Sequence, residues 1–128
     1  MNGYGASAYQ RVQTTLGPRQ LEAHLLLKAA AQLQSFKDNW SYDPEAIEQA
    51  LTLNRKLWTI LGTSATEESN PLPAAIKENI GNLTVFILKR TLEIMDDPTP
   101  EKLSALITIN RSLAQGLRGQ GDEEETVG

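Results

Sequence analysis

Two asparagines stand in otherwise apolar helical stripes and are the clearest candidates for a site in this sequence. Asn54 lies in a stretch, residues 50–61, whose apolar members recur at the spacing of one helix face. Asn110 has the same place in a second stretch, because residues 107–113 repeat the order of residues 51–57 with like-for-like changes. A primary amide donates and accepts hydrogen bonds, so these side chains can cross-link helices inside a bundle or line a groove that receives a partner's backbone. We favour buried amides that are hydrogen-bonded to loop backbone or to each other.

Large or cationic side chains lie beside both amides and are candidates for partner contacts. Trp and Arg dominate binding hot spots, and Arg55 lies one turn before Trp58 on a predicted helix. For Trp58 we favour a place in the core, where it would close an apolar face, over a contact with a partner. The candidate partner-binding residues are therefore Asn54, Arg55, Trp58, Asn110 and Arg111.

Residue types that catalyse reactions or hold metals are scarce in this chain. The single histidine, His24, has no carboxylate or serine three or four residues further on, and there is no cysteine, which excludes thiol nucleophiles and zinc–thiolate sites. The acidic clusters at residues 96–97 and 122–125 fit a helix end and a solvated tail better than a cation site. No glycine-rich phosphate loop occurs. The sequence indicates a protein that is not an enzyme and needs no cofactor or metal.

The charge pattern argues against nucleic acid and membrane as direct partners. The net charge of -4 comes from the run at residues 122–125, since the other 12 acidic residues balance the 12 basic ones. A body without a Lys/Arg cluster lacks the footprint that supplies most nucleic-acid affinity. The longest purely aliphatic run, residues 25–27, is far too short to insert into a membrane, and the N-terminus does not resemble a signal peptide. We expect a cytoplasmic protein.

The apolar periodicity predicts an all-α protein, a single-domain bundle of four long helices. Stripes at helical spacing cover residues 18–39, 44–61, 74–95 and 100–117. Prolines at the first helical position begin three of these helices, with Asp43 and Thr99 as expected N-caps for two of them. Tyr9, Val12 and Leu16 indicate a short additional N-terminal helix. Aromatic residues make up only 5% of the chain, so the core must consist mainly of Leu, Ile and Ala.

Composition also predicts the limits of the domain. Residues 1–7 are expected to form a flexible N-terminus and residues 8–118 the helical domain. Residues 119–128 combine glycines with four acids, which predicts a disordered acidic tail. Gly62 is the expected C-terminal cap of the second helix, and Gly81 is expected to let another helix approach the third one closely.

The third predicted helix carries apolar residues on more than one side. Ile80 and Ile87 belong to its main stripe, and Leu88, Leu92 and Met95 widen that stripe. A helix that is apolar over most of its circumference is normally buried. We therefore expect this helix to be buried on more than one side.

Several separated motifs, taken in order, carry a family resemblance over about residues 8–117. They are Pro18-Arg19-Gln20-Leu21-Glu22-Ala23, Asn54-Arg55-Lys56-Leu57-Trp58, Asn70-Pro71-Leu72-Pro73, and Ile109-Asn110-Arg111 followed by Gly116-Leu117. With these motifs the chain resembles the FlaF family of flagellar biosynthesis proteins. The acidic tail lies outside the resemblance.

The resemblance implies a cytoplasmic helper in bacterial flagellum assembly that binds flagellin and supports its synthesis and export, alongside the translational regulator FlbT. It implies no catalysis. Flagellin termini are amphipathic helices, so an apolar groove between helices is the expected receptor. The main hypothesis is an export chaperone that keeps flagellin soluble. The alternative is a regulatory adaptor that controls translation of flagellin mRNA through FlbT, and a third reading is a bundle in which every motif serves packing alone.

Overall fold

The computed structural model describes residues 17–40 and 43–127, with side chains placed as far as Gly119. Over these ranges it contains helices and no strand. The elements are α2 (Pro18–Asp38), α3 (Pro44–Ala65), α4 (Ala74–Asp96), the 3-10 turn η1 (Pro100–Lys102) and α5 (Leu103–Val127). The fold is thus the predicted all-α bundle. The short helix predicted around residues 9–16 lies outside the described residues.

The predicted helix starts are confirmed. Proline opens α2, α3 and the η1 turn that leads into α5, because its missing N–H costs nothing at the first helical position. Asp43 caps α3, since its carboxylate accepts a hydrogen bond from the backbone N–H of Ala46 at 3.3 Å. Thr99 occupies the N-cap position of η1, but its side chain makes no capping hydrogen bond.

The predicted end of the second helix is wrong, because α3 continues past Gly62 to Ala65. Gly62 does not have the positive φ of a helix cap. It lies inside the helix at a close approach to α4, where an added Cβ would come within 2.8 Å of Thr84 Oγ1. Leu61 and Ala65 are buried on either side of it. Their burial outweighs the cost of a helical glycine, which is about 1 kcal/mol.

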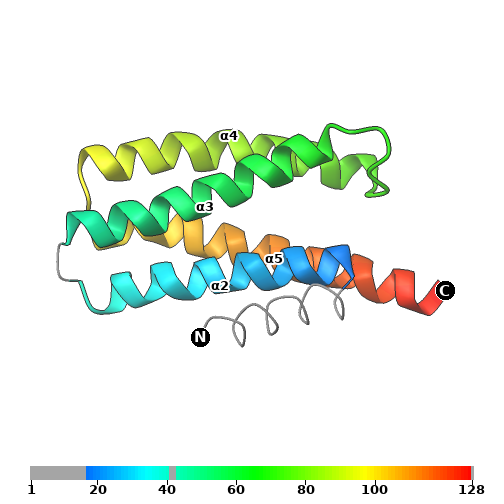
Figure 1. Cartoon of the computed structure of the whole chain (residues 1–128), viewed down its shortest axis with the longest axis horizontal. Helices are drawn as coiled ribbons and strands as arrows, with labels where there is room; N and C mark the ends of the chain where they lie inside the picture. The colour runs from blue at the N-terminus through cyan, green and yellow to red at the C-terminus, as the bar shows by residue number, and fades with distance from the viewer. Residues whose placement is uncertain (1–16, 41–42, 128) are drawn as a thin grey trace, which may run out of the picture.

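The last helix is also longer than predicted. It was expected to end near Leu117, yet α5 continues to Val127, so the backbone of the acidic segment is helical instead of irregular. Extending an existing helix fixes one residue per hydrogen bond, and Glu is a good helix former. Figure 1 shows this end of α5 projecting past the other helices. The domain boundaries at residues 7 and 118 stay predictions.

The four helices are arranged as two antiparallel pairs (Figure 1). α3 and α4 form a hairpin that lies above α2 and α5. The first and last described helices, α2 and α5, make the most extensive contact in the bundle, and α3 also packs on α2. By contrast, α4 touches α5 at few points. Among the four pairs of neighbouring helices, α4 and α5 therefore have the loosest seam.

The core is aliphatic, as the composition predicts, but α4 contributes only one side to it. Ile80, Ile87 and Ile94 of α4 are at most 1% exposed, whereas Leu92 is 67% exposed and Met95 43%. The prediction that this helix is buried on more than one side is therefore wrong for the isolated chain. The prediction of a close helix approach at Gly81 is also wrong, because no atom lies within 4 Å of an added Cβ there.

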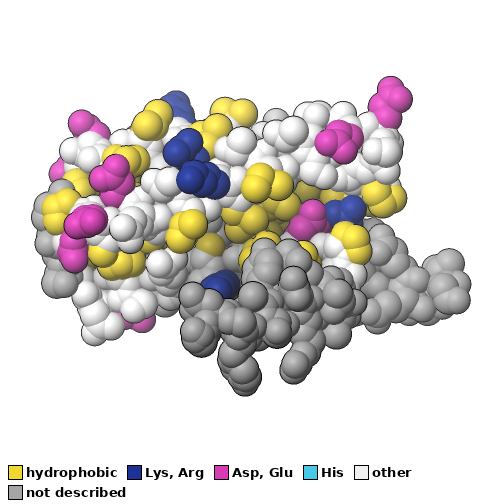
Figure 2. Space-filling view, viewed as in Figure 1, with side chains coloured by type: hydrophobic (Ala, Val, Ile, Leu, Met, Phe, Trp, Pro, Cys, Tyr) yellow, Lys and Arg dark blue, Asp and Glu magenta, His cyan; other side chains and the backbone are white. Residues whose placement is uncertain are grey.

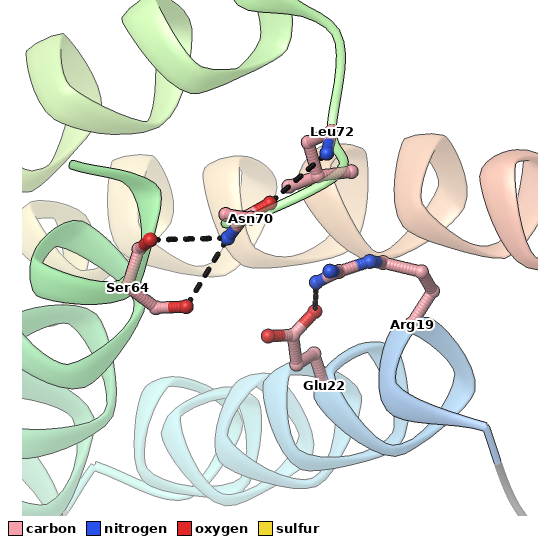
Figure 3. A network of polar contacts seen from close by, with 5 residues as sticks. All are labelled: Arg19, Glu22, Ser64, Asn70 and Leu72. Atoms are coloured by element: carbon pink, nitrogen blue, oxygen red, sulfur yellow. Dashed lines mark hydrogen bonds and ion pairs between the residues drawn. The ribbon is translucent and has the colours of Figure 1, made fainter. Parts of the chain in front are cut away.

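The loop between α3 and α4 is held against one end of the bundle (Figure 3). The side-chain amide of Asn70 donates hydrogen bonds to the backbone oxygen and to Oγ of Ser64, both at 3.1 Å, and accepts one from the N–H of Leu72 at 3.0 Å. In the same view, Arg19 of α2 is paired with Glu22, with Nη1 and Oε1 2.5 Å apart. Side-chain hydrogen bonds as well as prolines thus hold this loop.

Candidate functional site

The two predicted asparagines meet in the centre of the bundle. Asn110 Nδ2 donates hydrogen bonds to Asn54 Oδ1 at 2.7 Å and to the backbone oxygen of Leu26 at 3.3 Å. Asn110 Oδ1 accepts one from Trp58 Nε1 at 2.8 Å. The side chains of Asn54, Trp58 and Asn110 are fully buried, and together with the Leu26 carbonyl we term them the amide layer. The interpretation of buried amides bonded to each other is confirmed, with a helix carbonyl in place of loop backbone.

The two asparagines of the amide layer are not equivalent. Asn110 uses both its oxygen and its nitrogen, whereas Asn54 Nδ2 is buried without a hydrogen-bond partner among the described residues. The indole N–H of Trp58 can only donate, so the atom of Asn110 that faces it must be the oxygen. This contact therefore sets the orientation of the Asn110 amide. Two polar groups of α3, Trp58 Nε1 and Asn54 Oδ1, depend on Asn110 alone, and the Leu26 carbonyl of α2 accepts a further hydrogen bond from it.

The five predicted partner-binding residues separate into an interior and an exterior set. Asn54, Trp58 and Asn110 offer no surface to a partner in this conformation, because they are fully buried. Arg55 and Arg111 are exposed on different helices. Within the described ranges neither arginine forms an ion pair. A role for the five residues in partner binding stays a prediction.

A surface groove occupies the loose seam between α4 and α5. The α4–α5 groove has a volume of about 320 Å³. It is lined by four aliphatic side chains, by amide and hydroxyl groups and by a glycine, and none of these residues is charged: Ile76, Asn79, Leu83, Thr108, Ile109, Ser112, Leu113 and Gly116. An added Cβ at Gly116 would meet no atom within 4 Å. The groove is thus open at Gly116 and uncharged, with aliphatic side chains from both helices.

None of the groove residues was predicted as a site residue from the sequence. The available signal was the recurrence of small residues every four positions in α5, at Thr108, Ser112 and Gly116, which places them along one face of the helix. The repeat drew attention to Asn110 and Arg111 instead. Neither of these lines the groove.

The described residues offer no alternative site for a metal. No group of three or more His, Asp or Glu side chains that could hold an ion occurs among them. His24 lies exposed on α2. None of the helices in the described ranges combines the length and the apolar character that crossing a lipid bilayer requires.

Comparison with known proteins gives one match. A family model described as flagellar protein FlaF matches residues 5–117. No curated protein and no solved structure matches the chain significantly. The matched range contains the whole amide layer and all the residues of the α4–α5 groove. The resemblance of the sequence motifs is therefore confirmed, and the chain belongs to the FlaF family of flagellar proteins.

Proposed function

We propose that this protein is a cytoplasmic export chaperone for flagellin and that the α4–α5 groove receives an amphipathic helix of flagellin. Membership of the FlaF family supports a role in flagellar biosynthesis or its regulation. The observation that carries the proposal is the uncharged, largely aliphatic groove between two helices of a bundle. A groove of this kind suits the apolar face of a helix.

The chemistry of the groove suits binding followed by release. Full burial of one Leu or Ile side chain contributes roughly 1.5–3 kcal/mol, and two or three such side chains would enter a groove of this size. Part of that free energy is lost to the entropy cost of association. The affinity should therefore be modest, which would let a chaperone hand over its cargo. Because no charged residue lines the groove, binding should depend little on salt concentration.

Gly116 allows a direct test of the groove. In the Gly116→Trp variant the indole would project into the groove, where there is free space, and Trp is a better helix former than Gly. We expect flagellin binding, measured by isothermal titration calorimetry, to weaken about tenfold or more (roughly 1.4 kcal/mol) with no loss of thermal stability.

Gly119→Trp is the matched control. Gly119 is exposed on the same helix, has free space around it and does not line the groove, so its variant should bind flagellin as the parent does. If the parent protein forms no complex with flagellin in size-exclusion chromatography, the chaperone proposal fails. If Gly116→Trp binds flagellin normally, the groove is not the binding site even though flagellin is the partner.

The alternative function is a regulatory adaptor that acts on flagellin mRNA translation together with FlbT. Such an adaptor would use the same flagellin contact as a sensor. Loss of flagellin binding in Gly116→Trp that changes flagellin synthesis but leaves export of the synthesised flagellin intact would favour the adaptor over the chaperone.

A further inference from the structure

A second apolar surface lies on the outer side of α4. Val85, Leu88, Leu92 and Met95 are spaced three and four residues apart and form one stripe, which we term the α4 ridge. Val85 is 68% exposed, Leu92 67% and Met95 43%. None of the four lines the α4–α5 groove. Leu92 and Met95, which contributed to the prediction of burial on several sides, are thus exposed in the isolated chain.

The surface continues from the α4 ridge onto α3 as a shallow hollow. The hollow has a volume of about 340 Å³ and its residues are mostly small: Thr59, Gly62, Thr63, Thr66, Gly81, Thr84 and Leu88. Gly62 of α3 and Gly81 of α4 have no side chains, so the bottom of the hollow lies close to the backbone of both helices. The backbone of another helix can therefore approach the seam between α3 and α4 while its apolar side chains pack against the ridge.

Two cations stand on either side of the middle of the ridge. Lys89 follows Val85 by four residues on α4, and Arg55 precedes Gly62 by seven on the face of α3 that borders the hollow. Because Gly62 lies against Thr84 and the helices are antiparallel, Arg55 falls opposite about residue 91, close to the level of Lys89. Both are exposed, and neither forms an ion pair within the described ranges.

One acidic residue near the middle of this surface, Glu93, is paired with Arg90 at 3.4 Å, and the other acidic residues lie toward its ends. Glu48 lines a small pocket together with Met95, Asp96 follows Met95, and Glu78 precedes Val85 by seven residues. In Figure 2, apolar side chains gather over the upper half of the molecule, where Figure 1 places α4, with Lys or Arg side chains among them. The charge pattern is positive at the centre and negative at the ends.

We infer that the α4 ridge is a second docking surface, for an amphipathic helix of another protein whose apolar stripe is flanked by carboxylates near its middle. Carboxylates placed there would pair with Arg55 and Lys89. A second copy of this chain fits less well, because antiparallel two-fold pairing of α4 centred on Leu88 would bring the two Lys89 side chains together. The surface is separate from the proposed flagellin groove, so both can be occupied at once.

Two synthetic helical peptides with the same leucine stripe test this inference. One carries glutamates beside the middle of the stripe and the other carries lysines there. By fluorescence anisotropy in low salt, we expect the glutamate peptide to bind about tenfold more tightly or better, and this preference to shrink as salt screens the charges. The Gly81→Trp variant should lose binding, because its indole would fill the hollow, whereas Gly116→Trp should retain it.

Reversing the charge of both central cations gives the most specific test. The variant with Arg55→Glu and Lys89→Glu should prefer the lysine peptide, since both central charges change sign. Equal binding of the two peptides by the parent protein would overturn the inference. So would undiminished binding by Gly81→Trp. A concentration-dependent dimer, seen by light scattering and dispersed by Leu92→Ser, would overturn it in favour of a second copy as the occupant.

Discussion

The amide layer buries polar side chains in an aliphatic core, whereas α4 exposes aliphatic side chains on the surface. In the layer, hydrogen bonds of 2.7 to 3.3 Å join three helices through Asn110. On α4, Val85 and Leu92 are about two-thirds exposed. A buried polar contact favours one packing arrangement over others, while an exposed apolar stripe favours association. Substitutions in the two regions should therefore separate stability from binding.

The largest expected effect is that of Asn110→Ala on stability. The change leaves Trp58 Nε1 and Asn54 Oδ1 without their partner and removes the additional bond to the Leu26 carbonyl, and an unsatisfied buried group costs about 1–3 kcal/mol. We expect the free energy of unfolding to fall by roughly 3–5 kcal/mol, measured by urea denaturation followed by circular dichroism. The exposed Asn82 of α4 supplies the control, since Asn82→Ala should change stability by no more than about 0.5 kcal/mol. A loss below about 1 kcal/mol for Asn110→Ala would show that the layer does not hold the helices together.

A smaller effect is expected for Asn54→Leu, although Asn54 has the equivalent place in the sequence repeat. This change removes one hydrogen-bond acceptor, but it also removes the unpaired Nδ2 from the core. We expect a loss of about 1 kcal/mol or less in the same denaturation experiment. If Asn54→Leu were as damaging as Asn110→Ala, the two amides would have to contribute equally, and the asymmetry described above would be wrong.

The smallest effects are expected at the two exposed arginines, and they concern binding. Arg111 does not line the α4–α5 groove, so Arg111→Ala should leave flagellin affinity within about twofold and stability within about 0.5 kcal/mol. Arg55→Ala should weaken binding of the glutamate peptide about threefold to tenfold, because the substitution removes one of the two positive charges at the centre of the ridge. Titration of both variants with flagellin and with the peptide distinguishes the two surfaces. If Arg55→Ala and Arg111→Ala changed the affinities for flagellin and for the glutamate peptide equally, the two surfaces would not be distinct binding sites.

Most of the fold could be predicted from the sequence, because helix starts depend on local chemistry. Asp43 and the prolines at the first helical positions mark the starts within a few residues. The ends of α2 and α4 were predicted within one residue, whereas those of α3 and α5 could not be predicted in this way. From the sequence alone, Gly62 fits a helix cap. Its role in the structure is instead to allow the close approach of Thr84, which lies on another helix.

The candidate site could be predicted only in part. Burial of Asn54 and Asn110 followed from their place in apolar stripes, which is a property of each helix alone. The α4–α5 groove depends on which helices are neighbours and how tightly they pack, and periodicity contains neither piece of information. The exposure of Leu92 and Met95 was missed for the same reason, since an apolar stripe does not reveal whether its partner lies in the same chain.

The pairing of α2 with α5 determines when this protein can finish folding. The hydrogen bond between Asn110 and Leu26 joins residues 84 positions apart, whereas the α3–α4 hairpin is built from local contacts. During synthesis the hairpin can therefore form early, while α2 has to wait for nearly the whole chain to leave the ribosome. Until then the part of the apolar face of α2 that packs on α5 is uncovered and vulnerable to misassembly. Ribosome-bound chains truncated before residue 110 should consequently be far more sensitive to proteolysis in α2 than the released protein.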